Sequence, residues 1–287
     1  MNILVTGSNG QLGSELRKIS GNFPDYRFFF TDVEELDITQ QDTVMDFVEK
    51  NAIQTIINCA AYTAVDKAES DESTATLINA VAVKHLAKAC DQSSATLIHV
   101  STDYVYDGCG YKPYDEDHCT APVSAYGRSK LAGEEAALST PKSVVIRTSW
   151  LYSSFGNNFV KTMLRLGKER ESLNVIFDQV GTPTYAADLA QAIMVIARNV
   201  ERNELVQGVF HYSNEGVCSW YDFAHEIMQQ AGLKCMVKPI ETKDYPTPAT
   251  RPHYSVLNKA RIKAAYNITI PNWKDSLKIC LEEIKNS

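Results

Sequence analysis

The sequence has no long apolar run and no excess of positive charge. No stretch of about 18 apolar residues occurs, so no membrane-spanning helix is expected. The 28 Lys and Arg residues are outnumbered by 35 Asp and Glu residues, and the net charge of -7 disfavours nucleic acid or an acidic membrane as the main partner. The segment after Met1 also lacks the basic start and the length of a signal peptide. We therefore expect a cytoplasmic protein.

Cysteine and histidine patterns that bind metals are missing as well. The 7 Cys residues are dispersed without a Cys-x-x-Cys pair, and the 6 His residues show no His-Glu-x-x-His spacing. An odd, dispersed set of cysteines is typical of reduced thiols in a cytoplasm. The sequence therefore predicts reduced cysteines and disfavours a zinc enzyme.

The first half alternates short β-branched runs with helical patterns, which is typical of β-α-β units around a parallel sheet. Runs such as "TIIN" and "SVVIRTS" predict strands that are buried on both faces. We therefore expect an α/β fold with a Rossmann-type doubly wound parallel sheet. The predicted strands are Asn2–Thr6, Arg27–Phe30, Thr55–Asn58, Thr96–Val100 and Ser143–Thr148, and the predicted helices are Gln11–Ser20, Gln40–Asn51, Ala75–Ala89 and Ser124–Leu138.

Beyond Trp150 the alternation loosens, and helical patterns are separated by loops that contain Gly and Pro. We expect a first domain over residues 1–150, with segments returning to it around 172–213. A smaller, partly interleaved C-terminal α/β domain is expected over 151–287. Its predicted helices lie near Asn158–Gly167, Ala187–Arg198, Tyr221–Ala231 and Trp273–Lys285.

A glycine-rich turn follows the first predicted strand. Gly7, Gly10 and Gly13 form Gly-x-x-Gly-x-x-Gly where a helix begins, a variant of the dinucleotide fingerprint. Glycines there allow a tight turn and let the backbone approach a pyrophosphate, which the free N–H groups of the helix N-terminus would bind. A strand-to-helix turn without a ligand is the alternative. The motif predicts that the first domain binds a dinucleotide.

Acidic residues after the second predicted strand bear on which dinucleotide binds. Asp32 stands 19 positions after Gly13, where a carboxylate would accept hydrogen bonds from the adenosine ribose and repel a 2′-phosphate. This position favours NADH over NADPH. The choice stays open, because Asp37 could face the adenine and Asp32 could be only a surface turn residue.

Hydroxyl, phenol and ammonium groups are expected near the carboxyl end of the fourth strand. Ser101 and Thr102 lie there, at the edge where open parallel sheets bind ligands. Tyr126 and Lys130 follow one helical turn apart on one face, and no other Tyr in the chain has Lys at this spacing. A solvated helix face is the alternative for this pair. Beside a dinucleotide site, however, the catalytic interpretation is favoured.

The Tyr–Lys spacing has a physical rationale. A free tyrosine, with a pKa near 10, is a poor acid at neutral pH. An ammonium about 4 Å away is worth roughly 4 kcal/mol at an effective dielectric near 20. That interaction could lower the phenol pKa by as much as about 3, before desolvation of the lysine weakens the effect. We therefore expect Tyr126 to have a lowered pKa and to protonate a carbonyl oxygen as hydride reaches its carbon.

Together these motifs resemble the extended short-chain dehydrogenase/reductase family. Further segments, which span nearly the whole chain, resemble the dTDP-4-dehydrorhamnose reductases within it. The resemblance implies reduction of the 4-keto group of dTDP-4-dehydro-L-rhamnose to dTDP-L-rhamnose with NADH or NADPH, by a monomer or homodimer whose second domain binds the substrate. The segments are "NCAAYTAVDKAESD", "YGRSKLAGE", "RTSWLY", "GNNFVKTMLRL", "QVGTPTYAADLA" and "YPTPATRPHYSVL".

The resemblance also implies roles for single residues. Tyr126 is the expected proton donor, Lys130 its electrostatic partner and ribose anchor, and Thr102 the hydroxyl that holds the same oxygen. Contacts with the nucleotide sugar are implied for Thr102, Asp103, Trp150, Asn158 and Arg251, although a lone Trp is more often a core residue. Contacts with the cofactor are implied for Gly7, Gly10, Gln11, Leu12, Gly13, Asp32, Asp37, Ile38, Ala61, Tyr62, Thr63, Tyr126 and Lys130.

A bridging metal is not expected. Some relatives are described as magnesium-linked dimers held by glutamates, and Glu15 matches the first of these positions. Ala187 stands at the second, and no C-terminal counterpart is evident. An isolated surface carboxylate cannot hold Mg²⁺, because that ion requires near-octahedral oxygen ligation. We therefore expect no metal.

Other functions on this fold remain open. A sugar-nucleotide dehydratase would need an Asp-Glu pair after Thr102, and Tyr104 stands at the glutamate position, which disfavours dehydration. Another NAD-dependent nucleotide-sugar epimerase or reductase needs no such pair. A non-catalytic regulatory subunit, of the methionine adenosyltransferase type, also resembles this family and can retain Tyr-x-x-x-Lys. The segments quoted above favour a reductase.

Overall fold

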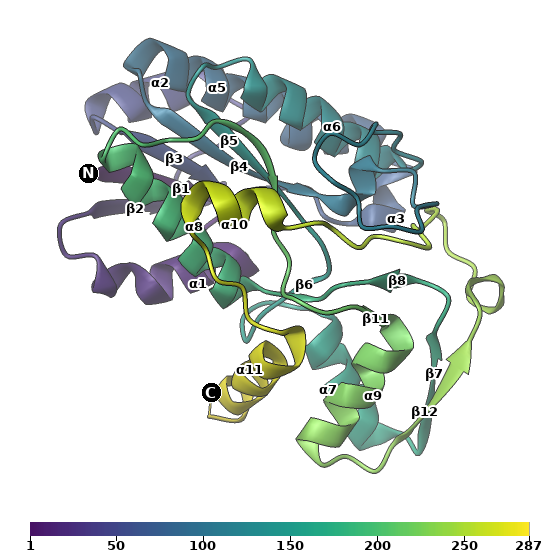
Figure 1. Cartoon of the computed structure of the whole chain (residues 1–287). Coiled ribbons are helices and arrows are strands. Elements are labelled where there is room, and N and C mark those ends of the chain that lie inside the picture. Colours follow the sequence, from purple (N-terminus) through teal and green to yellow (C-terminus); the bar gives the residue numbers. More distant parts are fainter. Residues whose placement is uncertain (287) are drawn as a thin grey trace.

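In the computed structural model, which describes residues 1–286, a six-stranded parallel sheet runs in the order β10-β5-β4-β3-β1-β2 (Figure 1). The five predicted strands are confirmed, and the sixth lies in the segment that was expected to return to the first domain. Their bounds are β1 (Asn2–Thr6), β2 (Arg27–Thr31), β3 (Thr55–Asn58), β4 (Thr96–Thr102), β5 (Ser143–Thr148) and β10 (Gly208–His211).

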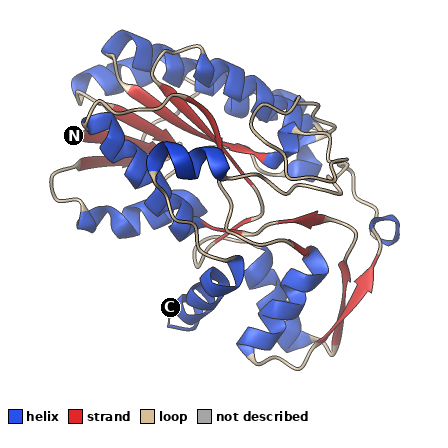
Figure 2. Cartoon of the chain, viewed as in Figure 1, coloured by secondary structure: helices blue, strands red, loops and turns tan. Residues whose placement is uncertain are grey.

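Both faces of the sheet are covered by helices, as Figure 2 shows. Successive strand residues point to opposite faces, so Ile3 and Val5 join one core and Leu4 the other. The first core contains residues of α1 (Gln11–Ile19), α8 (Ala186–Glu201) and α10 (Ala260–Tyr266). The second contains residues of α2 (Gln41–Lys50), α5 (Ala82–Ser93) and α6 (Ala125–Leu138). The doubly wound α/β prediction is therefore confirmed.

The strand order places a topological switch point between β1 and β3. The chain leaves β1 for β2 on one side and then returns to β3 on the other. Connections on either side of such a point diverge and leave a crevice at the carboxyl ends of the strands, where ligands bind. The glycine turn after β1 and the segment after β3 therefore face the same space.

A second group of elements has its own core (Figure 1). Helices α7 (Phe159–Glu169), α9 (Trp220–Ala231) and α11 (Trp273–Asn286) pack there with the parallel pair β7 (Ser172–Ile176) and β12 (Met236–Ile240). This separate core supports the predicted domain division, which stays a prediction. No helix among residues 1–286 combines the length and the apolar character that crossing a membrane demands.

Short elements complete the chain. The helix predicted at Ala75–Ala89 is longer than expected and contains a π-turn. The remaining bounds are α3 (Val65–Ala68), α4 (Glu72–Thr76), the π-turn η2 (Leu77–Val81), the 3-10 turns η1 (Ser20–Asn22), η3 (Asp103–Val105) and η4 (Thr242–Asp244), and the two-residue strands β6 (Leu151–Tyr152), β8 (Val180–Gly181), β9 (Thr184–Tyr185) and β11 (Cys218–Ser219).

Candidate functional site

The glycine turn between β1 and α1 has the geometry of a phosphate-binding loop. Gly7 has φ +65, and a Cβ built on it would lie 2.6 Å from the backbone of Ala60. A Cβ on Gly13 would lie 2.5 Å from the carbonyl oxygen of Gly7. Helix α1 begins after Gly10 without a side-chain cap, so the N–H groups of its first turn lack an N-cap side-chain acceptor. These features fit a bound pyrophosphate.

A cavity of about 530 Å³ opens at the carboxyl ends of β1, β3 and β4. It brings together most of the predicted site residues. The predicted residues Asp32, Asp37, Ile38, Tyr62 and Arg251 lie outside its lining. Those that line it are Gly7, Gly10, Gln11, Leu12, Gly13, Ala61, Thr63, Thr102, Asp103, Tyr126, Lys130, Trp150 and Asn158.

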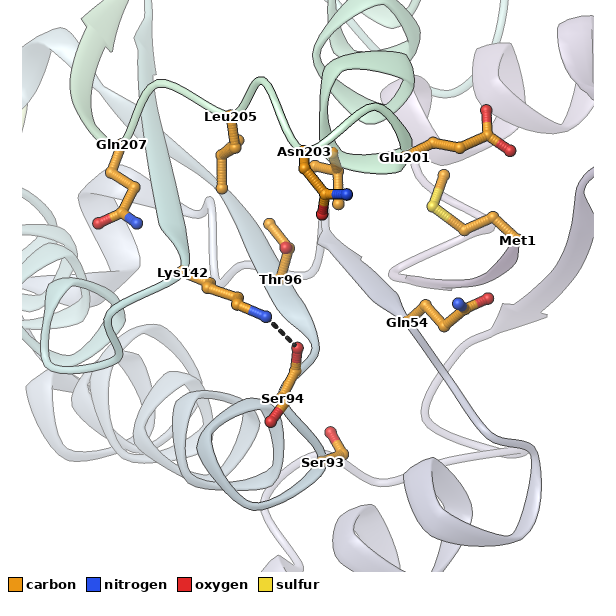
Figure 3. Close-up of a pocket in the computed structure, with 11 residues that line it drawn as sticks. Met1, Gln54, Ser93, Ser94, Thr96, Lys142, Glu201, Asn203, Leu205 and Gln207 are labelled. Carbon is orange, nitrogen blue, oxygen red and sulfur yellow. Dashed lines mark hydrogen bonds between the residues drawn. The ribbon is translucent and has the colours of Figure 1, made fainter.

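A second cavity, also about 530 Å³, lies at the opposite edge of the sheet and is drawn in Figure 3. Its lining comes from residues at or just before the amino ends of the strands, among them Met1, Gln54 and Thr96. Lys142 donates a hydrogen bond to the carbonyl oxygen of Ser94 across it (3.1 Å; Figure 3). Because open parallel sheets bind ligands at the carboxyl ends of their strands, we assign the candidate site to the first cavity.

Tyr126 and Lys130 enter that cavity from the first turns of α6. The hydroxyl of Ser124 caps this helix by accepting a hydrogen bond from Gly127 N–H (3.1 Å). Tyr126 is 9% exposed and Lys130 2%. The Lys130 ammonium donates to the carbonyl oxygen of Val100 at 2.7 Å. Both members of the predicted pair therefore lie against β4 and face the glycine-lined space.

The expected lowering of the Tyr126 pKa is wrong for the site in this structure. Burial raises the pKa of Tyr126 to about 12, although a hydrogen bond with Thr102 opposes the effect. Burial also lowers the pKa of Lys130 to about 8. Desolvation disfavours the charged form of each group, and the ammonium is bound to a backbone carbonyl. The sequence spacing carried no information about either effect.

A buried polar row behind Lys130 was not found from the sequence. The ammonium lies 3.5 Å from Nε2 of His99, whose Nδ1 lies 3.0 Å from Nδ2 of Asn58. The side-chain oxygen of Asn58 accepts a hydrogen bond from Thr6 (2.7 Å). Burial, reinforced by the charge of Lys130, lowers the pKa of His99 well below its usual value, so the ring is neutral. This row, from β1, β3 and β4, lies directly behind Lys130, whose ammonium is hydrogen-bonded to the Val100 carbonyl on β4.

The π-turn η2 serves the site by presenting Asn79. This buried amide accepts a hydrogen bond from Tyr62 N–H (2.8 Å) and donates to the carbonyl of Tyr62 (3.1 Å) and to the hydroxyl of Ser129 (2.9 Å). It thereby ties the cavity wall at Ala61 and Thr63 to α6. A π-turn inside a helix is common at functional sites, but no residue spacing in the sequence predicted this one.

Asp32 and Asp37 lie outside the cavity lining. The Asp32 carboxylate accepts hydrogen bonds from the backbone N–H groups of Asn9 (3.1 Å) and Val33 (2.9 Å), which places it beside that turn at the end of β2. Asp37 instead accepts from the N–H and hydroxyl of Thr39, and these bonds lower its pKa. Ile38 is buried in the second core. The structure therefore places only Asp32 directly against the glycine turn.

Asn158 and Arg251 have partners within the chain. Asn158 caps α7 and donates to the side-chain oxygen of Gln11 at 3.0 Å, so it lies at the glycine-turn end of the cavity. Arg251 forms a two-pronged pair with Asp66, with N–O distances of 3.0 and 2.7 Å. This pairing raises the pKa of Arg251 and lowers that of Asp66. The paired N–H groups that could clamp a diphosphate are thus bonded to Asp66 in this structure.

Trp150 is held in an unusual conformation at the far side of the cavity. Its φ is +48, a left-handed value that costs a non-glycine residue about 1–3 kcal/mol. Its ring stacks on Trp220 with centroids 3.7 Å apart and planes at 11°. A Cβ on Gly181 would lie 2.8 Å from the Trp150 ring, so only glycine leaves room for it. The stacked pair fixes the Trp150 ring in the lining of the cavity.

We expect Trp150→Ala to raise KM for the substrate about tenfold, since a stacking contact worth about 1 kcal/mol is lost with its buried area. Steady-state kinetics and thermal unfolding of the same preparation measure both effects. Trp273→Ala is the matched control: Trp273 is buried in the core of the second group, so this change should lower the melting temperature and leave KM unaltered. A stability loss without a KM change in Trp150→Ala would identify Trp150 as a core residue.

Glu15 is not the isolated surface carboxylate expected from the sequence. It is fully buried and accepts a hydrogen bond from Ser153 (2.6 Å), and burial raises its pKa. Lys18 lies 3.9 Å from Glu15 and 2.6 Å from Glu283, so a C-terminal glutamate is also nearby. Among residues 1–286, however, no group of three or more His, Cys, Asp or Glu side chains is placed to hold a metal ion.

Comparisons with known proteins agree on one family. The family described as "RmlD substrate binding domain" matches residues 1–286. The chain is 42% identical to a dTDP-4-dehydrorhamnose reductase of Aggregatibacter actinomycetemcomitans, over 96% of this chain and 97% of that one. The crystal structure of a reductase of the same name from Clostridium acetobutylicum superposes with a TM-score of 0.94 at 42% identity, covering 99% of this chain and 100% of the other.

A further solved relative contains a cofactor. The dTDP-4-dehydrorhamnose reductase of Bacillus anthracis, in complex with NADP, has a TM-score of 0.93 at 40% identity and covers 98% of this chain and 99% of its own. A dTDP-glucose 4,6-dehydratase of that organism and a UDP-glucose 4-epimerase of Thermus thermophilus are only 18% and 17% identical. Those two share the fold alone.

Proposed function

Because the chain belongs to the family of dTDP-4-dehydrorhamnose reductases, we propose that it reduces the 4-keto group of dTDP-4-dehydro-L-rhamnose to dTDP-L-rhamnose with NADH or NADPH. The observation that carries this proposal is the single cavity that joins the glycine turn to Thr102, Tyr126 and Lys130. The reduced nicotinamide supplies a hydride when bound. The chain supplies the proton and the environment in which both transfers occur.

The proposed roles follow from the contacts of each residue. Gly7 and Gly13 let the turn close against the backbone of Ala60 and of Gly7, and the uncapped N–H groups of α1 would bind the pyrophosphate. Lys130 donates one N–H to the Val100 carbonyl, and another would bind a ribose hydroxyl of the cofactor.

Tyr126 is the proposed proton donor. Its pKa of about 12 keeps the phenol protonated at neutral pH, so the acid form is always present. Protonation of the carbonyl oxygen then has to coincide with hydride arrival, because only the developing alkoxide is basic enough to take a proton from so weak an acid. Thr102 hydrogen-bonds Tyr126 and would position its phenol toward that oxygen.

The substrate would occupy the part of the cavity away from the glycine turn. Trp150 and Asp103 line the same cavity as Tyr126 and are the proposed contacts with the sugar. We propose that Arg251 binds the diphosphate only after exchanging Asp66 for it, since a phosphate offers the same paired oxygens as a carboxylate. We also propose a cytoplasmic location and a monomer or homodimer.

The direct test is oxidation of each reduced cofactor by the purified chain. With dTDP-4-dehydro-L-rhamnose we expect stoichiometric oxidation, with a higher kcat/KM for NADH because the Asp32 carboxylate repels a 2′-phosphate. The matching UDP-4-keto sugar is the control and should react more slowly. Isomerisation of the sugar without net oxidation would indicate an epimerase. A stable complex with a methionine adenosyltransferase, without turnover, would indicate a regulatory subunit.

A further inference from the structure

The cavity contains a carboxyl group, that of Asp103, which has no proton-transfer role in the reduction proposed above. Asp103 is 2% exposed and directly follows Thr102 at the end of β4. Its Oδ1 accepts a hydrogen bond from the Thr102 hydroxyl at 3.0 Å, whereas Oδ2 is buried without a hydrogen-bond partner among residues 1–286. An ionised carboxylate with an unpaired buried oxygen is costly, and the protonated form is much less so.

The pKa of Asp103 agrees with this geometry. Burial raises it to about 7, and the hydroxyls of Thr102 and Ser255 only partly oppose the rise. Ser255 lies close enough to stabilise the charged form, yet its Oγ, like Oδ2 of Asp103, has no hydrogen bond of normal geometry within the described chain. Asp103 can therefore gain and lose a proton near neutrality.

The Thr102 hydroxyl lies between this carboxyl and Tyr126. It interacts with both groups and stabilises the charged form of each. A hydroxyl has one hydrogen, so it donates to only one of them at a time. In the structure it donates to Asp103. When Asp103 is protonated, the carboxyl donates to Thr102 Oγ1, and the threonine hydrogen turns toward Tyr126.

We propose that Asp103 is a proton reservoir that restores Tyr126 through the Thr102 hydroxyl in each turnover. This inference rests on the proposed reductase activity. The phenolic O–H bond of Tyr126 breaks as its proton forms the new hydroxyl of the product. The phenolate takes the hydroxyl hydrogen of Thr102, and Thr102 Oγ1 takes the hydrogen of Asp103 Oδ1. The negative charge ends on Asp103, which one proton from water neutralises after product release.

The direction of transfer is favourable. A phenolate whose conjugate acid has a pKa of about 12 takes a proton readily from an acid with a pKa of about 7. The titratable groups that interact with Asp103 are the phenols of Tyr104, from the same turn, and Tyr126, from α6. Neither is charged at neutral pH, so neither competes for the proton.

Cations near the site are engaged elsewhere. Lys130 donates to the Val100 carbonyl, and Arg251 is paired with Asp66. A cation bound to Asp103 would hold it ionised and prevent it from storing a proton. Neither cation bonds Asp103 within residues 1–286, so Asp103 can hold a proton.

Asp103→Asn tests the proposal while preserving the shape of the side chain. In the wild-type protein we expect the steady-state turnover rate to fall tenfold per pH unit above about 7, because only protonated Asp103 can restore Tyr126 between turnovers. In Asp103→Asn we expect a rate lower by a factor on the order of 10², without that pH limb. The plot of rate against the deuterium fraction of the solvent should change from curved in the wild-type protein to linear in Asp103→Asn.

Asp91→Asn is the control, because Asp91 is at an exposed position. This variant should retain the wild-type pH profile.

Ser255→Ala provides a test that leaves both proton carriers intact. It removes a hydroxyl that stabilises the charged carboxylate, so the pH limb should move to higher pH. Difference infrared spectroscopy should show a protonated-carboxyl band that titrates near pH 7 in the resting protein and is missing only in Asp103→Asn.

Each outcome separates the inference from the proposed function. Asp103→Asn could instead raise KM while the rate still falls above pH 7 and still depends on solvent deuterium along a curve. That result would contradict the reservoir and identify Asp103 as a substrate contact. An unmoved limb in Ser255→Ala would overturn it too. Absence of turnover in the wild-type protein would instead contradict the reductase proposal, and the infrared titration would still report whether Asp103 holds a proton.

Discussion

Tyr126→Phe is expected to lower the single-turnover rate of keto-sugar reduction by a factor of about 10²–10⁴, the usual contribution of a positioned acid. The substitution removes one hydroxyl from a side chain that is 9% exposed and leaves its ring contact with Tyr104 (centroids 5.4 Å apart) in place. Binding of NADH should therefore be unchanged. Stopped-flow absorbance of the reduced cofactor measures the rate, and fluorescence titration measures the binding.

The matched control is Tyr111→Phe, because the Tyr111 side chain is 85% exposed and lies outside the cavity lining. Its rate should equal that of the wild-type protein. Should Tyr126→Phe retain comparable turnover, another group would have to deliver the proton. Asp103 would then be the first candidate, since its carboxyl lines the same cavity and has a pKa of about 7.

Arg147→Met is expected to destabilise the protein by about 3–5 kcal/mol, because it strands a buried carboxylate. Arg147 and Glu134 are 5% and 2% exposed, and the guanidinium binds both carboxylate oxygens, with distances of 2.9 Å from Nε and 2.6 Å from Nη2. Glu134 also accepts a hydrogen bond from Ser101 (2.5 Å), a lining residue of the cavity. Urea denaturation followed by circular dichroism measures the change.

Two further variants test whether the expected loss of stability comes from the unpaired buried charge of Glu134. Arg165→Met breaks the exposed pair Arg165–Glu169 and should change stability by no more than about 0.5 kcal/mol. The double variant Arg147→Met, Glu134→Gln removes the stranded charge and should recover much of the loss. If the double variant were as unstable as Arg147→Met, the damage would come from lost packing rather than from an unpaired charge.

The fold was predictable because its signals are local. The run "TIIN" predicted a strand at Thr55–Asn58 with the bounds that β3 has, and Asn2–Thr6 and Ser143–Thr148 also match β1 and β5. A strand covered on both faces is rich in β-branched apolar residues, such as Ile56 and Ile57, so its composition reveals it. The strand β10 was harder to define, because its four residues carry little periodicity.

The candidate site was predictable where its residues follow one another in a motif. Gly7, Gly10 and Gly13, and the pair Tyr126 and Lys130, do line one cavity. Asp37 and Ile38 do not line it. The Asp37 carboxylate is hydrogen-bonded within its own turn, and Ile38 is buried in the second core. Whether a predicted residue lines the cavity depends on its neighbours in the fold, which no local sequence pattern specifies.

The residues that support the site were not predictable. Asn79, His99 and Glu134 each act through partners on other elements, and a single Asn, His or Glu in the sequence carries no sign of that. The buried position of Glu15 was missed for the same reason, since its burial depends on packing against the segment that contains Ser153.

The sequence by itself determined which chemical groups the chain presents and in what order: a glycine turn after a buried strand, then a hydroxyl, a phenol and an ammonium. Tertiary structure alone decided the acidity of those groups. Tyr126, Lys130 and Asp103 take pKa values of about 12, 8 and 7 because each is desolvated and bonded to neighbours distant in the chain or on another element. Spacing along a helix places two charges near each other, but only the folded environment sets the free energy of ionising them.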